Sequence, residues 1–234
     1  MAFNPKTTLD INQNGIKIAL FGESGVGKTW QISTLRRPFI ISSEKGLLTL
    51  NALGLDIPYV EVSTMDELKE ARNALSNEEY ASTYDTLVID SVTEIAELCL
   101  SDLKTKTADP RKAYLDTQDA VSRELRAFFN IEDKDIVMIF KSGRIEDKDT
   151  NRVSYAPIVN NDKFSAKIPY LFDEVLALRT GKDTDGNVTR YIQTVNDGNY
   201  ACKDRSGKLY PTEEADLGQI IEVIRQEKDN NGEE

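Results

Sequence analysis

The sequence predicts an α/β fold in which a mostly parallel β-sheet is flanked by helices and followed by a C-terminal β-hairpin region. Apolar runs of strand length alternate with segments of helical periodicity, which is the pattern of a parallel sheet covered by helices. A glycine-rich turn follows the first apolar run directly, and an Asp-Gly turn separates two later runs, as in a hairpin. With 234 residues and 39% hydrophobic content, the chain can bury one substantial core.

The first expected elements are short apolar runs bounded by stop signals. Residues 16–21 form a strand that ends at the glycine-rich turn, and residues 28–35 form a helix that stops before Pro38. Residues 39–42 and 59–62 have the length and apolar content of two further strands. These elements begin the alternation of strands and helices that a parallel sheet requires.

The middle of the chain is expected to be mainly helical. Residues 65–75 have helical periodicity after a cap at Ser63 or Thr64, and residues 86–90 form a buried strand. Two more helices follow in residues 92–103 and 112–129, and residues 104–111 form the polar connection between them. The next core strand is residues 136–141.

A long polar segment precedes the predicted hairpin. Residues 143–167 are rich in turn and charged residues, have little apolar periodicity, and exceed an ordinary connection in length. We therefore expect a functional or mobile loop there. Residues 172–179 and 189–194 are the strands that flank the Asp-Gly turn in residues 181–187.

One domain accounts for nearly the whole chain. Residues 213–225 have the pattern of a closing helix, and no internal repeat divides the sequence. We expect a single domain over residues 1–226, followed by an acidic, disordered tail in residues 227–234.

The residue composition excludes several classes of chemistry. Because histidine does not occur, Ser-His-Asp catalysis, Cys-His catalysis and imidazole metal ligation are excluded. Cys99 and Cys202 are too few for a disulfide framework and indicate a reducing compartment. The first residues do not resemble a targeting segment, and no stretch approaches the roughly 18 apolar residues of a membrane span. We expect a soluble, cytoplasmic protein without a membrane partner.

The glycine-rich turn matches the complete pattern of a phosphate-binding loop, or P-loop. Its residues are Gly22, Glu23, Ser24, Gly25, Val26, Gly27, Lys28 and Thr29. In such a loop the backbone N–H groups and the helix N-terminus surround the β-phosphate, Lys28 reaches the β and γ oxygens, and Thr29 binds Mg²⁺. The sequence therefore predicts a site for ATP and Mg²⁺.

A carboxylate at the end of a buried strand is the expected second partner of the metal. Asp90 ends the apolar run at residues 86–90, where P-loop proteins carry the acidic residue that holds Mg²⁺. An aspartate there is also a common helix cap, but the P-loop in the same chain favours the metal role. Ser91 follows where many P-loop ATPases have a catalytic glutamate, so the base must come from elsewhere.

Two glutamates compete for the role of orienting the attacking water. Glu44 follows the second expected strand, at the carboxyl edge of the sheet where ligands collect, and is the leading candidate. Glu94 is the alternative, although a favourable charge in the first turn of a helix is its simpler role.

Together these features resemble the RecA-type ATPases, and most closely the phage Sak-type single-strand annealing and recombination proteins, a phage nucleotide-binding AAA-type family. The resemblance covers most of the chain and rests on the P-loop and on residues 42–46, 87–91, 136–140, 155–157, 172–175 and 203–205. It implies a RecA-like P-loop NTPase fold, ATP hydrolysis stimulated by single-stranded DNA, and Glu44 as the residue that activates water. It also implies a homo-oligomer, as a ring or filament, in the cytoplasm of a host cell, with a single-strand-binding protein as a further partner.

The resemblance also assigns DNA contact to two regions, residues 103–112 and 143–167. Their expected DNA-binding residues are Lys104, Lys106, Arg111, Arg144, Arg152, Tyr155 and Lys163. Cations neutralise phosphates and the tyrosine can stack on a base, whereas interspersed aspartates dilute the charge of residues 143–167, and a solvated surface loop is the alternative there. Because the chain has 29 Lys and Arg against 40 Asp and Glu, a net charge of -11, DNA contact must come from such local regions.

Lys203 and Arg205 resemble the Lys-x-Arg pair that RecA- and DnaB-like assemblies extend into the ATP site of a neighbouring subunit. The alternative is an ordinary charged edge strand. Lys141 and Ser142 stand where related proteins carry a Gln or His sensor of the γ-phosphate, which leaves the sensor open. Two other functions also stay open: a P-loop kinase of a small molecule or nucleotide, and a nucleotide-gated adaptor that loads a replication protein.

Overall fold

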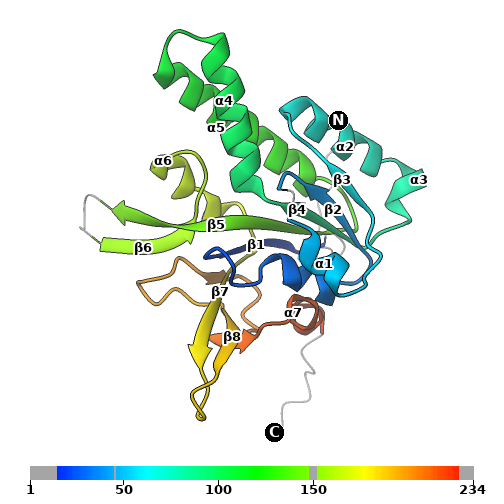
Figure 1. Cartoon of the computed structure of the whole chain (residues 1–234), viewed down its shortest axis with the longest axis vertical. Coiled ribbons are helices and arrows are strands. Elements are labelled where there is room, and N and C mark those ends of the chain that lie inside the picture. Colours follow the sequence, from blue (N-terminus) through cyan, green and yellow to red (C-terminus); the bar gives the residue numbers. More distant parts are fainter. Residues whose placement is uncertain (1–14, 45, 148–151, 227–234) are drawn as a thin grey trace, which may run out of the picture.

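The computed structural model describes residues 15–44, 46–147 and 152–226, whose arrangement Figure 1 shows. The expected tail at residues 227–234 lies outside the described residues. The strands are β1 (Lys17–Gly22), β2 (Pro38–Ser42), β3 (Tyr59–Glu61), β4 (Thr86–Asp90), β5 (Asp135–Asp147), β6 (Arg152–Pro157), β7 (Glu174–Lys182), β8 (Val188–Gln193), β9 (Lys203–Asp204) and β10 (Thr212–Glu214). The α-helices are α1 (Leu48–Ala52), α2 (Met65–Leu75), α3 (Glu78–Ala81), α4 (Val92–Lys106), α5 (Pro110–Phe129), α6 (Asp162–Ser165) and α7 (Leu217–Arg225), and the 3-10 helices are η2 (Thr29–Thr34) and η3 (Ile168–Tyr170).

The described strands form one mixed sheet in the order β10-β8-β7-β1-β5-β4-β2-β3, with β6 paired to β5 and β9 paired to β7. The run from β7 to β3 is parallel throughout, and β8 and β10 are antiparallel. Strand β5 lies between β1, which leads into the P-loop, and β4, which ends at Asp90. The predicted α/β fold with a mostly parallel sheet and a C-terminal hairpin is confirmed.

Helices cover both faces of the sheet because successive residues of the central strands point to opposite sides. On β1, Ala19 and Phe21 pack with residues of α2, α4 and α5, whereas Ile18 and Leu20 pack with residues of η2 and α7. All these side chains of β1 are fully buried. Figure 1 shows α4 and α5 as a long helical hairpin on one side and α1 and α7 on the other. The two apolar layers hold the carboxyl ends of the strands in fixed positions.

The P-loop continues into the 3-10 helix η2 instead of the helix expected at residues 28–35. The hydroxyls of Ser33 and Thr34 donate to backbone carbonyls three residues earlier, which competes with α-helical bonding. The side chain of Gln31 donates to the carbonyl of Ala215 and accepts from the N–H of Leu217, so the start of α7 is fastened to η2. Long-range packing therefore decides the form of this short helix.

The described part of residues 143–167 does not form the loop that the sequence predicts; residues 148–151 lie outside the described residues. Strand β5 continues through Asp147 and pairs antiparallel with β6, in register from Ser142 opposite Pro157 to Asp147 opposite Arg152. The short helices α6 and η3 follow this hairpin. Sequence periodicity missed it because a two-stranded ribbon that extends beyond the core needs few apolar residues.

Two other boundaries differ for similar reasons. Helix α4 extends to Lys106 and α5 begins at Pro110 under an Asp109 cap, so most of the expected connection at residues 104–111 is helical. Its polar side chains lie on exposed helix surfaces. Strand β10 occupies the start of the helix expected at residues 213–225, and α7 begins only after the Asp216 cap. Among the described helices, none combines the length and the apolar character needed to cross a membrane.

Candidate active site

The P-loop starts where β1 touches β7. A side chain at Gly22 would place its Cβ 2.6 Å from the carbonyl oxygen of Leu178, so only glycine lets the two backbones approach this closely. Gly25 and Gly27 have φ values of +77° and +103°, which side chains rarely permit. These glycines let the chain turn back on itself at the carboxyl end of β1, as phosphate binding requires.

Lys28 lies within the turn that the glycines make. Its ammonium donates to the carbonyl oxygens of Gly22 at 2.9 Å and Glu23 at 2.8 Å. Burial lowers the pKa of this ammonium, and the negative charges of Asp90 and Glu44 act in the opposite direction. The P-loop therefore presents a partly buried cation to the two carboxylates that the sequence analysis selected.

Thr29 and Asp90 join the P-loop to the end of β4. The Thr29 hydroxyl donates to Oδ2 of Asp90 at 2.9 Å. Asp90 is 5% exposed, and its burial together with the charge of Glu44 raises the pKa of its carboxyl group to about 6, although the Thr29 bond opposes the shift. Two oxygen ligands of the kind that Mg²⁺ prefers are thus held side by side.

The donor set fits a Mg²⁺ ion that is shared with a nucleotide. In the described part of the chain, no group of three or more His, Cys, Asp or Glu residues could hold a metal. Mg²⁺ usually takes one or two protein ligands together with substrate phosphates and water. Thr29 and Asp90 would hold the ion beside the phosphates that the P-loop binds.

The carboxyl ends of β2 and β4 and the start of α4 bring both candidate glutamates to Lys141, in the middle of β5. Glu44 accepts a 2.5 Å hydrogen bond from the hydroxyl of Ser91, and the backbone N–H of Glu44 donates to the carbonyl oxygen of Asp90. The Lys141 ammonium lies 2.8 Å from Glu94, 3.6 Å from Glu97 and 3.9 Å from Glu44. The hydrogen bond that Lys141 donates to Glu94 contributes most to raising the pKa of Lys141. Sequence reasoning left Lys141 without a role and did not foresee this cluster.

Comparison with known families decides the assignment. A family model described as an AAA domain matches residues 14–206, which is most of the chain. The chain belongs to the AAA domain family. Among solved structures, it is similar to a KaiC-like protein of the hyperthermophilic archaeon Pyrococcus horikoshii OT3, at 14% identity and a TM-score of 0.47 over 77% of this chain and 79% of that chain. No curated protein matches it. The protein is thus an AAA domain with a P-loop ATPase fold, and the narrower resemblance to phage Sak-type proteins stays a prediction.

Lys203 and Arg205 of the AAA domain lie at the opposite end of the sheet from its own P-loop. Strand β9 pairs with the start of β7, which is next to the start of β1. Lys203 donates to the carbonyl oxygens of Pro169, at 2.7 Å, and Phe172, and Arg205 pairs with Asp173 at 2.7 Å. The two cations therefore lie away from the P-loop of their own chain.

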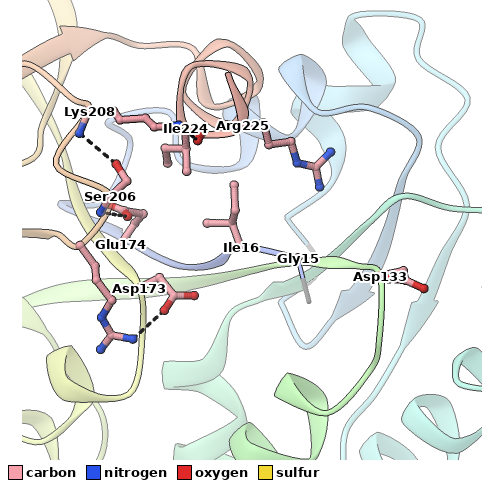
Figure 2. Close-up of a pocket in the computed structure, with 10 residues that line it drawn as sticks. Gly15, Ile16, Asp133, Asp173, Glu174, Ser206, Lys208, Ile224 and Arg225 are labelled. Carbon is pink, nitrogen blue, oxygen red and sulfur yellow. Dashed lines mark hydrogen bonds and ion pairs between the residues drawn. The ribbon is translucent and has the colours of Figure 1, made fainter. Parts of the chain in front are cut away.

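Arg205 also borders a cavity of about 660 Å³ at this end of the sheet, between the starts of β1 and β7 and the end of α7. Figure 2 shows Asp173, Glu174, Lys208 and Arg225 around it. Lys208 donates to the carbonyl oxygen of Ile224, and Arg225 binds the carboxylate of Asp135. The cations at this end of the molecule are engaged in holding its own elements together.

The expected DNA-binding residues occupy two separate surfaces. Arg144, Arg152 and Tyr155 are exposed on the hairpin of β5 and β6, and Lys163 is exposed on α6 nearby. Tyr155 stacks on Tyr200, with ring centroids 5.2 Å apart. The second surface is the junction of α4 and α5, where Lys104 lies over the ring of Tyr114, Lys106 pairs with Asp102, and Arg111 is exposed.

Arg190 is a residue at the P-loop that sequence reasoning missed. It belongs to β8, and its Nε donates to the carbonyl oxygen of Val26 at 2.8 Å. The two residues are 164 positions apart, and one arginine in an exposed strand carries no recognisable pattern. Only the register of β8 against β7 places it beside the P-loop of the AAA domain.

Proposed function

We propose that this AAA domain is an ATP-binding, Mg²⁺-dependent ATPase of the RecA-like type. The observation that supports this proposal most directly is the hydrogen bond between Thr29 and Asp90, beside the P-loop lysine. It puts the two expected metal ligands at the same point as the predicted phosphate-binding backbone.

The proposed reaction is the attack of water on the γ-phosphorus of ATP. A bond forms from the water oxygen to phosphorus while the bond to the β,γ-bridging oxygen breaks, so ADP and phosphate leave and the water loses a proton. Bound Mg²⁺ neutralises charge on the phosphate oxygens. Lys28 and the backbone N–H groups of the P-loop stabilise the charge that develops on the transferred group.

Glu44 is the proposed residue that orients the attacking water. Its backbone is tied to Asp90, and its carboxylate accepts from Ser91, directly after Asp90. Glu94, the alternative, is the closest partner of Lys141 at 2.8 Å, whereas Glu44 lies 3.9 Å from that ammonium. A carboxylate that already binds a cation at 2.8 Å is less available to bind a water molecule, which supports Glu44.

Single-stranded DNA is the proposed polymer partner, in phage recombination or replication of the annealing or recombinase type. Strand β5 passes the ATP site at Lys141 and continues directly into the hairpin that carries Arg144. The exposed face of Tyr155, which is 39% exposed, offers a surface on which a base can stack. These features support DNA contact at the β5–β6 hairpin, close to the proposed ATP site.

A homo-oligomer, either ring or filament, is the proposed working form. Lys203 and Arg205 lie away from the P-loop of their own subunit. Lys203 is bound to two backbone carbonyls, whereas the Arg205 side chain is 58% exposed, which supports a role of the pair, through Arg205, at the ATP site of a neighbour. In that arrangement each ATP site would be completed by the next subunit. A single-strand-binding protein is a further proposed partner.

The test combines two measurements on the purified protein. ATP hydrolysis with Mg²⁺ is measured with and without single-stranded DNA, and particle mass is measured with a non-hydrolysable ATP analogue. We expect DNA to stimulate hydrolysis and the analogue to favour the oligomer. A monomer that transfers phosphate to a small acceptor would instead indicate a kinase. Nucleotide-dependent binding of a protein partner without DNA stimulation would indicate an adaptor.

A further inference from the structure

The β7–β8 hairpin reaches past the sheet edge and touches the P-loop from outside. Phe21 pairs with Ala177 in the register of β1 and β7, so the residues of β7 after Leu178 extend beyond Gly22. Thr180 is paired with Arg190 in that extension. Figure 1 shows the hairpin projecting away from the body of the sheet.

Arg190 makes two contacts with adjacent P-loop residues. Its Nε donates to the carbonyl oxygen of Val26 at 2.8 Å. A Cβ at Gly27 would lie 3.2 Å from Nε and 3.8 Å from Cζ of Arg190, so the guanidinium group packs against this glycine. The peptide between Val26 and Gly27 is thereby held by a side chain from a distant strand.

The orientation of that peptide matters because its two ends point in opposite directions. A carbonyl oxygen and the N–H of the following residue lie on opposite sides of a trans peptide. With the Val26 carbonyl turned toward Arg190, the N–H of Gly27 is directed to the other side. In a P-loop, the N–H groups that bind phosphate must face the nucleotide.

The base of the hairpin is rigid enough to hold Arg190 in place. Ile192, two residues further along β8, is fully buried. On the other face, Arg179 lies over the rings of Tyr191 and Tyr200, at 5.5 Å and 4.0 Å, and donates to Gln193. Arg190 is therefore presented to the P-loop from a strand that is packed on both faces.

We propose that Arg190 is a positioning residue of the ATP site: its hydrogen bond to the Val26 carbonyl fixes the peptide whose N–H binds nucleotide phosphate. The inference rests on the proposed ATPase function and adds a residue from the same subunit to that site. Because the bond acts on the P-loop whether the phosphate is reacting or only bound, it stabilises the substrate and the transition state alike. Its loss should weaken nucleotide binding and leave kcat nearly unchanged.

Two variants of similar size separate the hydrogen bond from other roles. In Arg190→Gln, the side-chain nitrogen follows the δ-carbon, as Nε does in arginine, so a donor to Val26 is retained without the charge. Arg190→Met has a comparable length and no donor. Lys182→Ala is the control, since Lys182 is a cation on the same face of the hairpin, two positions further toward its turn.

The experiment measures the Kd of a non-hydrolysable ATP analogue with Mg²⁺, together with the melting temperature of each protein without nucleotide. We expect Arg190→Met to raise Kd about tenfold, the effect of losing a hydrogen bond from a charged donor. Arg190→Gln should stay within about threefold of the wild type, and Lys182→Ala should bind as the wild type does. The kcat of both Arg190 variants at saturating ATP should change less than about threefold.

Three results would overturn the proposal. Unchanged Kd in Arg190→Met, with or without a lower melting temperature, would make Arg190 a structural contact only. Equal losses in the Met and Gln variants would mean that the charge, and not the bond to Val26, acts on the nucleotide. A large fall in kcat would make Arg190 part of the chemical step. Lys28→Ala measured in parallel separates the two claims, because wild-type binding by that variant would reject the ATP site itself.

Discussion

The Thr29 hydroxyl donates a 2.9 Å hydrogen bond to Asp90 Oδ2, which joins the end of the P-loop to the end of β4. The two residues are 61 positions apart: Thr29 begins η2, after β1, and Asp90 ends β4, which β5 separates from β1 in the sheet. Asp90 is almost fully buried, so this hydroxyl is a main polar partner of its carboxylate. The bond is the point at which phosphate binding and metal binding meet in the proposed mechanism.

Substitution of Thr29 tests that relationship. Thr29→Val keeps the shape of the side chain but removes the hydroxyl, so the metal loses a ligand and Asp90 loses its hydrogen bond. We expect most Mg²⁺-dependent phosphate release to be lost, and Thr29→Ser to retain much of it. The measurement is the rate of phosphate release as Mg²⁺ is titrated. A valine variant with the rate and Mg²⁺ dependence of the wild type would contradict the assignment.

The choice of catalytic carboxylate is tested by two isosteric changes. Glu44→Gln keeps the size of the side chain and removes the charge that orients water, so we expect ATP to bind normally while turnover falls about 100-fold or more. Glu94→Gln should have a smaller effect, because Glu94 mainly pairs with Lys141. Single-turnover hydrolysis with bound ATP measures both. The reverse order of the two effects would assign the role to Glu94.

The DNA surface is tested by removing the cations of the β5–β6 hairpin and of α6. We expect the triple change of Arg144, Arg152 and Lys163 to alanine to weaken single-stranded DNA binding about equally for all sequences. It should also flatten the salt dependence, because phosphate contacts release counterions without reading bases. Fluorescence anisotropy at several salt concentrations measures both effects. A triple variant with unchanged affinity would reject this surface.

The second proposed DNA surface is tested separately with a matched triple variant at the α4–α5 junction. If only this variant loses affinity for single-stranded DNA, the DNA binds at the α4–α5 junction and not at the β5–β6 hairpin. The residues changed to alanine are Lys104, Lys106 and Arg111.

The proposed role of Arg205 at the ATP site of a neighbouring subunit is tested by mixing two inactive proteins. Arg205→Ala should bind ATP but hydrolyse it poorly, and Glu44→Gln should also be nearly inactive, because each lacks a different half of a shared site. Mixed oligomers should recover activity, since some interfaces then pair an intact Glu44 with an intact Arg205. Loss of an arginine that acts in this way typically lowers the rate of hydrolysis about 10³-fold or more.

The control for this experiment is the ion pair between Arg205 and Asp173. Asp173→Asn removes the pair but keeps the cation, so it should leave hydrolysis largely intact. If mixed oligomers form and show only the sum of the two residual rates, Arg205 does not act across a subunit boundary. If Asp173→Asn alone matches the loss in Arg205→Ala, the pair is structural.

Glu174, at the start of β7, predicts how stability depends on pH. Burial, and next the charge of Asp204, raise the pKa of its carboxyl group from 4.5 to about 8. Between these values the folded protein keeps a proton that the unfolded chain has released, so the free energy of unfolding falls as pH rises. The slope is up to about 1.4 kcal/mol for each pH unit.

Urea denaturation of the wild type and Glu174→Gln between pH 4 and pH 9 measures this effect. Glutamine does not titrate, so the unfolding free energy of the wild type should fall relative to that of Glu174→Gln as pH rises from about 4.5 to about 8. Other titrating groups, Asp90 among them, affect both proteins alike and cancel in the difference. If the unfolding free energies of the two proteins change in parallel over the whole pH range, Glu174 does not carry the predicted proton.

The sequence predicted most of the parallel sheet because buried strands need continuous apolar runs. The runs that became β1, β2, β4 and β5 were visible for this reason, and so was the P-loop, whose chemistry fixes residue types at set spacings. The hairpin of β7 and β8 was visible because Gly186, with φ of +84°, marks its turn.

The elements that sequence reasoning missed are those decided by distant contacts. Strand β6 has exposed Arg152 and Tyr155, and its pairing to β5 leaves little apolar pattern. Lys141 gains its three carboxylate neighbours only because β2 ends, and α4 begins, beside the middle of β5. Arg190 reaches Val26 through the register of a hairpin. Periodicity reports which face of an element is buried, and it does not report which residues of other elements lie opposite.

The most direct test of the proposed ATP site compares phosphate release from ATP by the wild type and by Lys28→Ala, with Mg²⁺ and single-stranded DNA present. No other residue can replace the contact of Lys28 with the transferring phosphoryl oxygens. We predict that the wild type releases phosphate and that the variant has no measurable turnover and binds the triphosphate weakly. Turnover by Lys28→Ala at the wild-type rate would contradict the assignment of Gly22 to Thr29 as the catalytic P-loop.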